Sequence, residues 1–543
     1  MSLTDSPVLL AGSSLLLLAF VKIATTYINR RSLKNLQGPA SPSFWIGNEF
    51  DIRFQKEVGD CEFKWMHDYG TAWRTAGCMG EDYLMLADPK ACQYILHTSG
   101  YHYPKRKDNR AISRFVTGDG IIWVEGADHQ RHRKVMNPAF GGAQLKSFVS
   151  LFHRTATKVL AQKWRDDVIA NDESGAPVIN VTKWLSHMTL DVIGEAGFGY
   201  QFNSLDDSKS ALSAVYKNLF IDSTLYPSKA DLVFKSMWRY LPDDVVNLFR
   251  YVPMKEYSRF RHYLDFIRGV GRDFIANNEA GDGKDILSIL LRANKSENAK
   301  TRLSDIETVD QISSLLLAGH DTTAFSVTWL LWELAKHPEY QAKVREELAA
   351  VRADVTARGD TEFSVADLDG LSMLIAVMKE GLRLHPIVWG TGRYAERDDV
   401  IPLAYPITTK TGERISSIPI SKGQIIQISI ASYNRLPEVW GEDVDSFRPE
   451  RFLEKENDSI SLGVYANLLN FSGGLRGCIG WRFSVLEMQT MLATLLENFE
   501  FALPDNADEM KILRKPTGMM VPMVDGQPRL GAWMGLKVTN VAQ

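Results

Sequence analysis

The fold of this chain is decided by one loop near its end, NFSGGLRGCIG, residues 470–480. Cys478 stands there on a glycine-rich turn, and an amphipathic pattern typical of a helix begins directly after Gly480. Backbone N–H groups and the helix dipole at such a position favour a thiolate. Glycines let the backbone approach a large, flat partner closely, and Arg476 adds a positive charge that can pair with an acid on it. The loop predicts a sulfur ligand beside a bulky acidic cofactor.

The cysteine content favours a site with a single protein ligand. The chain has four cysteines, Cys61, Cys78 and Cys92 early and Cys478 alone and late, which is not the pattern of a disulfide framework and suggests a reducing compartment. Zinc and iron–sulfur sites need several Cys or His ligands in close spacing, so the late cysteine points to haem iron. The alternative is a buried structural cysteine, which is what most isolated cysteines are.

The composition is that of an ordinary globular protein. Of the 543 residues, 45% are hydrophobic and 24% charged, and a formal net charge of −4 argues against a nucleic-acid-binding protein. From about Asp51 onward we find no long low-complexity linker and no internal repeat. Helical patterns dominate, with strand patterns near 72–87, 424–432 and 516–540, so we expect a mostly α class with a minor β part. Long helices are predicted at 143–165, 180–200, 258–278, 304–335 and 337–352.

The N-terminus has the pattern of a membrane anchor. Residues 8–28 are apolar or small with few exceptions, about the length that a helix needs to cross the hydrocarbon layer. Asp5 precedes this run and Arg30, Arg31 and Lys34 follow it, which by the positive-inside rule places the rest in the cytosol. A cleaved signal peptide, with its shorter apolar run and earlier basic residues, and a buried core helix are the alternatives. We expect a lumenal 1–7, a transmembrane anchor at 8–28, a Pro/Gly-rich hinge at 29–50 and one cytosolic domain at 51–543.

The late loop carries a family resemblance. The pattern Phe471-x-x-Gly474-x-Arg476-x-Cys478-x-Gly480 resembles the haem-binding loop of the cytochrome P450 superfamily, and three further motifs of that family stand in the right order. The resemblance covers roughly residues 35–535. It implies haem b, with Cys478 as the axial thiolate, in a triangular helical domain with a small β-rich subdomain.

The first further motif is EGLR, which places Glu380 and Arg383 on one helical face. Together with Arg451 in FRPERF they resemble the buried Glu-Arg-Arg triad of the family, which implies a structural role behind the haem. Taken alone, Glu and Arg at this spacing are usually a solvated surface pair.

The next motif, HQRHRKVMNPAF, resembles the early helix that clamps a haem propionate. His129 stands where the family commonly has Trp, four residues before Arg133, so both side chains face the same way. Arg393, in TGRYAERDDVIP, resembles by its position another propionate partner.

The long central segment carries AGHDTT, residues 318–323, which matches the oxygen-binding motif of the family. Thr322 offers a hydroxyl that donates and accepts, and Asp321 can relay protons from outside. Ala318 is small and leaves room over the haem, while Gly319 and the β-branched threonines favour a bulge. We interpret His320 as structural or solvent-linked rather than as a metal ligand.

Several segments resemble substrate-contacting parts of the family by position: 110–125, 387–391 and 516–522. Their apolar members suggest a hydrophobic substrate, with ordinary core packing as the alternative, namely Phe115, Ile121, Val388, Trp389 and Met519. The aromatic-rich segment 217–256 is expected to roof a channel dipping into the membrane. Arg131, Lys134 and Arg482 form either a basic dock for an acidic reductase or a solvated basic face.

The resemblance implies a monooxygenase anchored in the endoplasmic reticulum, with electrons from NADPH through a separate cytochrome P450 reductase and cytochrome b5 as a further donor. The sequence most resembles membrane-bound enzymes of fungi, including mushroom-forming ones. The expected substrate is a terpenoid of fungal secondary metabolism, triterpenoid or sterol-like, oxidised once or successively. A broad oxygenase of aromatics and xenobiotics, a haem-thiolate isomerase or dehydratase, and a haem sensor are the alternatives.

Overall fold

A computed structural model describes most of the chain after the N-terminal apolar run. The described residues are 31–157, 162–206, 219, 224–225, 227–277, 283–295, 302–454 and 460–541, with Leu17 and Phe20 upstream. The anchor predicted at 8–28 therefore lies outside the described residues except for these two. Within the part described, no helix combines the length and the apolar character that crossing a bilayer requires.

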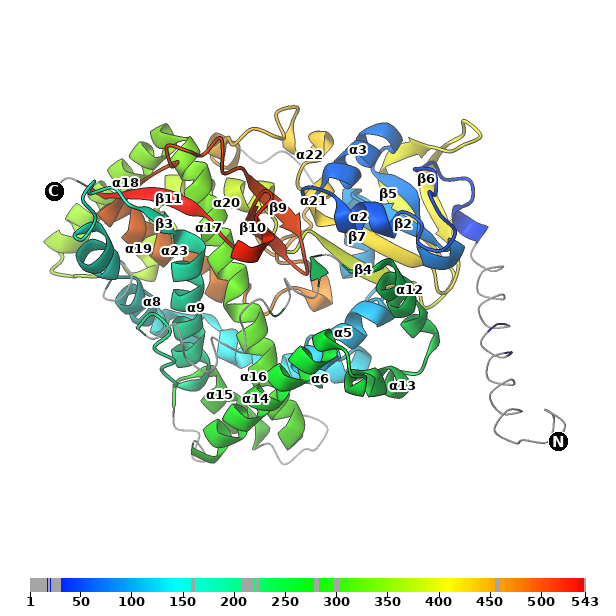
Figure 1. Ribbon diagram of the computed structural model, residues 1–543, viewed down its shortest axis with the longest axis horizontal. Helices are drawn as coiled ribbons and strands as arrows, with labels where there is room; N and C mark the ends of the chain where they lie inside the picture. The colour runs from blue at the N-terminus through cyan, green and yellow to red at the C-terminus, as the bar shows by residue number, and fades with distance from the viewer. Residues whose placement is uncertain are drawn as a thin grey trace.

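Helices make up most of the molecule, which confirms the predicted class (Figure 1). The first half contains α2 (Glu49–Phe54), α3 (Asp60–Tyr69), α4 (Pro89–Gln93), α5 (Lys107–Thr117), α6 (Gly126–Met136), α7 (Gly142–Ser147), α8 (Val149–Arg154), α9 (Val181–Phe198), α12 (Lys229–Met237), α13 (Asp243–Leu248) and α14 (Lys255–Asn277). The second half contains α15 (Ile286–Asn294), α16 (Asp305–Gly319), α17 (Asp321–Lys336), α18 (Pro338–Ala357), α19 (Val365–Gly370), α20 (Ser372–Leu384), α21 (Ile430–Tyr433), α22 (Pro437–Trp440) and α23 (Trp481–Asn498).

The strands form small sheets rather than one large one. They are β1 (Ala72–Ala76), β2 (Asp82–Leu86), β3 (Val178–Asn180), β4 (Gly390–Tyr394), β5 (Asp399–Thr408), β6 (Arg414–Ile420), β7 (Ile425–Ser429), β8 (Phe499–Ala502), β9 (Ile512–Pro516), β10 (Met520–Val524) and β11 (Gly535–Asn540). The largest has the order β1-β2-β7-β4, and the others are β3-β11-β8, β9-β10 and the hairpin β5-β6. The four-stranded sheet and this hairpin lie with α2 and α3 at one end of the molecule (Figure 1).

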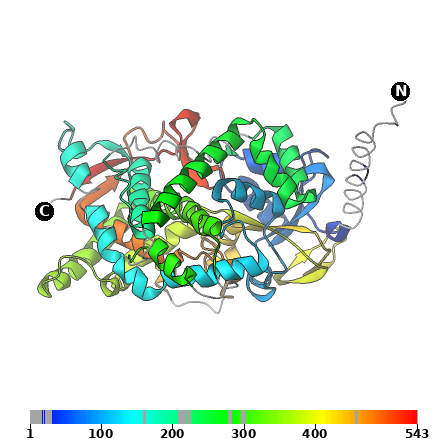
Figure 2. The same cartoon turned by 90° about the horizontal axis from the view of Figure 1, so that it is seen from below.

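The predicted central helix 304–335 is two helices. A capping box between Ser304 and Glu307 starts α16, which ends at Gly319, and α17 begins at Asp321. His320 separates them with φ −104° and ψ −64°. Both helices are largely buried and run through the middle of the helical part, packed against α9, as Figures 1 and 2 show. The irregularity expected beside Gly319 is a one-residue interruption at His320, whose backbone angles stay in the right-handed helical region, and the backbone N–H of Ala324 donates to His320 at 3.1 Å as the helical pattern resumes.

The segment predicted as a hinge is packed against the four-stranded sheet. Leu33 and Leu36 are buried in the main core. A Cβ on Gly38 would lie 1.8 Å from the carbonyl oxygen of Arg74 in β1, so only glycine fits this approach. The Asn48 side chain accepts from the backbone N–H of Ala76 at 3.0 Å. From Arg31 onward the chain is therefore part of the folded body.

Candidate functional site

Cys478 lies between the short turn η11 (Gly474–Arg476) and the start of α23. Its backbone N–H donates to the carbonyl oxygen of Phe471 at 2.8 Å, which closes the loop on itself. The backbone N–H of Ser484 donates to Gly480 at 2.9 Å in the first turn of α23. The body of α23 is buried, so the cysteine is fixed at the N-terminal end of a core helix.

The thiol of Cys478 is accessible, yet protein groups surround it. Burial raises the pKa of this thiol above its usual value, while the backbone N–H of Gly480 and the guanidinium of Arg133 lower it. The helix terminus alone therefore does not favour the thiolate in the protein without a metal. A metal cation bound to the sulfur supplies the missing stabilisation, because a coordinating thiol is deprotonated.

The glycines of the loop have different structural roles. Gly474 has φ +62°, and a Cβ there would lie 1.8 Å from the carbonyl oxygen of Leu96 in η3 (Tyr94–Thr98). Gly473 is similarly close to the His97 ring, with 2.5 Å between the added Cβ and Nε2. At Gly480 the nearest atom, on Phe140, is 3.7 Å away. The close backbone contact with Leu96 requires glycine at position 474, whereas a side chain at position 480 would meet no close contact within the protein.

A cluster of buried cations lies beside the cysteine loop. Arg476 pairs with Glu125, which also accepts from the backbone N–H of Lys105 at 2.9 Å. Arg393 is buried, and its guanidinium donates to the Thr391 hydroxyl at 2.7 Å. Burial lowers the pKa of Lys105 to about 7 and the pKa of Arg393 to about 10, and Arg476 acts in the same direction on both. The cluster carries more positive than negative charge and is suited to anionic groups.

Helix α6 contributes Arg133 and His129 to the same region. Arg133 donates to the carbonyl oxygen of Gly477 at 2.8 Å, directly before the cysteine. His129 Nδ1 lies 2.7 Å from the hydroxyl of Tyr101, whose ring lies 4.6 Å from the Arg476 guanidinium. Burial, with Lys105 and Arg476 as further causes, lowers the pKa of His129 to about 3. His129 is therefore a neutral hydrogen-bonding group at pH 7.

The structure brings Glu380, Arg383 and Arg451 together. Arg383 forms a bidentate pair with Glu380 at 2.7 and 2.8 Å, and both side chains are fully buried. Arg451 Nε lies 3.5 Å from Glu380, and Arg383 also donates to the carbonyls of Asn434 and Val444. These bonds link α20 to the segment 434–451, so the surface-pair alternative is wrong for these residues.

Thr322, near the start of α17, donates through Oγ1 to the carbonyl oxygen of Ala318 at 2.7 Å, across the interruption between α16 and α17. Ala318 is exposed although Leu316 and Thr323 beside it are buried. An exposed residue within a buried helix indicates an open space inside the protein. Ala318 and Thr322 border this space with a small side chain and a hydroxyl.

The carboxylate of Asp321 points toward α9 and not toward Thr322. Its Oδ1 accepts from the Ser186 hydroxyl at 3.1 Å and lies 3.0 Å from His320 Nε2. His320 Nδ1 lies 3.2 Å from the carbonyl oxygen of Leu316. The sequence predicted Asp321 as a proton relay; its two partners were not predicted.

The expected substrate-contacting residues divide into two groups. Phe115 is core: it is 1% exposed and packs on the rings of Trp238 and Tyr257. Val388 is exposed, and Ile121, Trp389 and Met519 are partly buried at the edge of the core. The second group therefore remains available to an apolar ligand, whereas Phe115 supports the fold.

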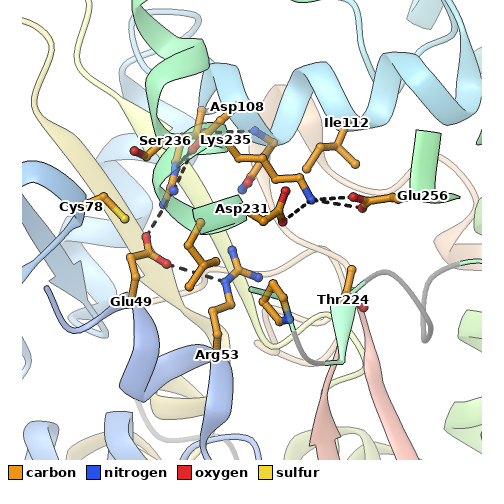
Figure 3. Close-up of a pocket in the computed structure, with 14 residues that line it drawn as sticks. Glu49, Arg53, Cys78, Asp108, Ile112, Thr224, Asp231, Lys235, Ser236 and Glu256 are labelled. Atoms are coloured by element: carbon orange, nitrogen blue, oxygen red, sulfur yellow. Dashed lines mark hydrogen bonds and ion pairs between the residues drawn. The ribbon is translucent and has the colours of Figure 1, made fainter. Parts of the chain in front are cut away.

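A polar cavity of about 80 Å³ lies beside the described part of segment 217–256, which was expected to form a roof, between α2, α5, α12 and α14. One group of ion pairs lining the cavity joins Arg106 to Glu49 and Asp108. A second group joins Lys235 to Asp231 and Glu256 (Figure 3). The ion pairs tie the N-terminal helix α2 and the roof helix α12 to the body of the protein.

The three residues considered for a docking surface differ in their exposure and in their ion pairs. Arg131 is bound by Glu307 and Asp128, at 2.6 and 3.0 Å, and its side chain is only 18% exposed. Lys134 and Arg482 are exposed, with Arg482 over the Trp481 ring at 4.1 Å. Of the three cations predicted to form a basic dock, Lys134 and Arg482 are therefore the two that are exposed.

The residues around Cys478 fit a haem. One accessible sulfur is available for the iron. The excess of positive charge from the buried Arg393 and the partly buried Lys105, Arg133 and Arg476 matches the two carboxylates of the group. Within the described residues, no group of three or more His, Cys, Asp or Glu side chains is arranged to bind a bare metal ion. Lys105, Tyr101 and Glu125 were missed by the sequence reasoning, because no short motif marks them.

Comparison with known proteins gives one consistent result. A family model described as Cytochrome P450 matches residues 37–528. The cytochrome P450 monooxygenase claP of Ampulloclitocybe clavipes is 33% identical over 532 residues, covering 96% of each chain. Cytochrome P450 monooxygenase 205 of Postia placenta is 33% identical over 544 residues, covering 95% of this chain and 94% of its own. The claQ monooxygenase of Ampulloclitocybe clavipes is 31% identical over 510 residues, covering 93% of each chain.

Proposed function

The chain belongs to the cytochrome P450 family and is a monooxygenase, and from this premise we propose that it oxidises a lipophilic terpenoid, triterpenoid or sterol-like, in fungal secondary metabolism. The observation that carries the proposal is the set of accessible apolar side chains, Val388, Trp389, Ile121 and Met519, at positions expected to contact substrate. Such a lining binds a ligand with few charges.

The family implies a haem-thiolate centre, and the proposed axial ligand is Cys478. When bound, haem supplies the chemistry that activates oxygen, favoured by the electron-donating thiolate. The chain holds the group through Cys478 and orients it with the cations Arg133, Arg393 and Arg476, while Phe471, Gly474 and Gly480 shape the loop. Ala318 leaves space, and Thr322 holds a hydroxyl proton at Oγ1 facing the same region. Asp321 receives protons from the α9 side.

A membrane location is part of the proposal, and the sequence and exposed apolar side chains support it. We propose a single-pass anchor at 8–28 in the endoplasmic reticulum membrane, with the catalytic domain in the cytosol. Phe44 and Trp45 are 57% and 63% exposed, and Leu248 and Tyr251 of the roof are 63% and 67% exposed. Exposed apolar groups of this size are typical of surfaces that meet a membrane or a partner.

A member of this family needs a redox partner. We propose NADPH–cytochrome P450 reductase, with cytochrome b5 as a further electron donor. Lys134 and Arg482 are exposed cations near the cysteine loop and suit an acidic partner surface.

The proposal is tested by product formation in microsomes that contain the full chain and a fungal reductase. NADPH is supplied with a panel of sesqui-, di- and triterpenoids, and with simple aromatics. A terpenoid product that gains one or more oxygen atoms, only with NADPH, supports the proposal. Turnover of the aromatics alone would contradict it and favour a detoxifying oxygenase.

The matched control is Cys478→Ala in the same microsomes. It should abolish both the thiolate-type carbon monoxide spectrum and the product. Survival of that spectrum in the variant would refute Cys478 as the ligand.

A further inference from the structure

Glu125 stands at the N-cap position of α6, yet its side chain forms no capping bond with that helix. Polar side chains at this position ordinarily accept from the first backbone N–H groups of the helix. The carboxylate of Glu125 points instead to the cysteine loop, where its Oε2 accepts from Arg476 Nε at 3.0 Å and also from Nη2. The local bond of a helix start is thus exchanged for a contact with a residue 351 positions away.

The other oxygen of this carboxylate is also bound. Oε1 accepts from the backbone N–H of Lys105 at 2.9 Å and lies 3.9 Å from Lys105 Nζ. The same Nζ donates to the carbonyl oxygen of Val124 at 3.1 Å and to that of Ile122. Lys105 therefore holds the loop before α6 through both its backbone and its side chain, and the carboxylate is fixed between two cations.

The surroundings of Glu125 are strongly cationic. The backbones of Lys105 and Arg393 form an isolated antiparallel bridge, which sets two cations side by side. For both residues burial is the main cause that lowers the pKa, and Glu125 is the acidic group that opposes it. Burial acts to raise the pKa of Glu125, but Lys105 and Arg476 outweigh this effect and hold that pKa below its usual value. Glu125 is therefore a carboxylate at pH 7.

Arg476 has donors left for a second anion. A guanidinium carries five N–H groups on three nitrogens, and Arg476 uses Nε and Nη2 for Glu125. The ring of Tyr101 lies 4.6 Å from the guanidinium and fixes it further. Nη1 has no hydrogen-bond partner in the part of the chain that the structure describes. One guanidinium, only 8% exposed, can thus serve Glu125 and an acid of a bound group together.

We propose that Glu125 is a resident anion of the haem site, which holds Arg476 and Lys105 in position before haem binds and then competes with a haem carboxylate for Arg476. Its charge relieves the repulsion among the cations of the empty site. In the loaded site the same charge weakens the attraction of the cations for the haem carboxylates. It also favours ferric over ferrous iron, because negative charge stabilises the more positive ion. Glu125 is a positioning residue, and the proposal rests on haem held at Cys478.

The first test measures transfer of haem from the full-length, haem-loaded protein to an acceptor globin. Glu125→Gln keeps the shape of the side chain and removes its charge. The cations then hold the haem carboxylates more strongly, so transfer should be several-fold slower than in wild type. Equal or faster transfer, or failure of the variant to retain haem, would overturn the proposal and leave Glu125 as a residue of the fold alone.

The second test measures the reduction potential of the haem iron by a spectroscopic redox titration without substrate. Glu125→Gln should shift the potential to a more positive value, because the ferric state loses a nearby negative charge. A site that is merely loosened admits water, which favours the ferric state and shifts the potential in the opposite direction. An unchanged or more negative potential would therefore contradict the proposal.

Two matched variants separate the charge of Glu125 from its shape and from the net charge of the protein. Glu125→Asp keeps the charge, so its reduction potential should stay close to that of wild type. Asp128→Asn makes the same change of charge on α6, at a side chain that is 66% exposed and paired with Arg131, and should alter neither haem transfer nor the potential. Equal shifts in Asp128→Asn and Glu125→Gln would refute a specific role of Glu125.

Both readouts are independent of the proposed substrate, because neither measurement requires turnover. A thiolate-type carbon monoxide spectrum in every variant shows that Cys478 still binds the iron. Loss of that spectrum in Cys478→Ala tests the ligand, and the shifts in Glu125→Gln test the resident anion, so the two proposals fail separately.

Discussion

The Thr323 hydroxyl lies 2.9 Å from the Ser484 hydroxyl and so joins α17 to α23. Residues just before Thr323 carry the proposed proton relay, and Cys478 stands just before α23. This contact is one of those by which α17 and α23 pack together and hold the two sides of the site in place. Glu487, on the next turn of α23, also lies beside Thr323.

Glu487 gives a prediction about pH and stability. It is fully buried, neither of its carboxyl oxygens has a hydrogen-bond partner, and burial raises its pKa well above the usual value, which the neighbouring Thr323 only partly offsets. The folded protein keeps this proton, whereas the unfolded chain loses it above about pH 4.3. The contribution of Glu487 to stability is thus greatest at low pH and falls as pH rises, by up to ~1.4 kcal/mol per pH unit. Glu487→Gln should gain stability relative to wild type between pH 5 and pH 8 in urea unfolding; an equal difference at both pH values would contradict this.

Glu380 should be a large contributor to stability. Glu380→Gln leaves the buried guanidinium of Arg383 without its carboxylate, and breaking a buried pair from one side costs roughly 3–5 kcal/mol. The midpoint of urea unfolding and the yield of haem-loaded protein should both fall. The control is Arg358→Ala, which removes ion pairs with Asp360 and Asp367 at the surface and should leave the midpoint of unfolding nearly unchanged. Similar losses in the two variants would show that burial of the first pair is unimportant.

Two glycines of the cysteine loop should respond differently to the same change. Gly474→Ala places a Cβ 1.8 Å from Leu96 O at φ +62°, so we expect a loss of several kcal/mol or failure to fold. Gly480→Ala meets its nearest atom at 3.7 Å and should fold like the wild type. Circular dichroism melting of the haem-free proteins measures both effects, and haem content is recorded separately. A stable Gly474→Ala protein would show that the backbone approach to η3 is not required.

Arg133 should hold the haem more than it holds the fold. Arg133→Ala removes a half-buried cation beside Cys478, and transfer of haem to an acceptor globin should become several-fold faster. Lys134→Ala removes the adjacent cation, which is exposed, and provides the control. Equal transfer rates in both variants would exclude Arg133 from haem retention.

The sequence predicted several long helices correctly because their apolar positions repeat at helical spacing, but the single helix predicted at 143–165 is wrong, since α7 ends at Ser147 and α8 begins at Val149. The segments 180–200 and 258–278 correspond closely to α9 and α14, and Pro338 does begin α18. The hairpin β5-β6 was missed: Pro402 and Pro406 interrupt the first strand, and the register shifts between Pro402 and Ile407. A proline within an apolar run weakens the strand pattern, whereas pairing with a second strand restores it.

At the site, motif spacing identified residues but not their directions. Glu380 and Arg383 meet because their spacing on a helix brings them together. The direction of Asp321 depends on Ser186, which is 135 residues away in the chain. In the same way, the sequence around Phe115 gave no indication that the rings of Trp238 and Tyr257 pack against it. Long-range packing decides such features, and one sequence contains no signal for it.

The packing of residues 31–48 on the sheet affects how the protein can be produced. A water-soluble version that starts at residue 51 would discard Leu33 and Leu36 from the core and expose the edge of β1 that Asn48 covers. A version that starts at Arg31 keeps these contacts and removes only the apolar run. The boundary for truncation, and for attaching a purification tag or a fused reductase, is therefore set by the sheet and not by the first long helix.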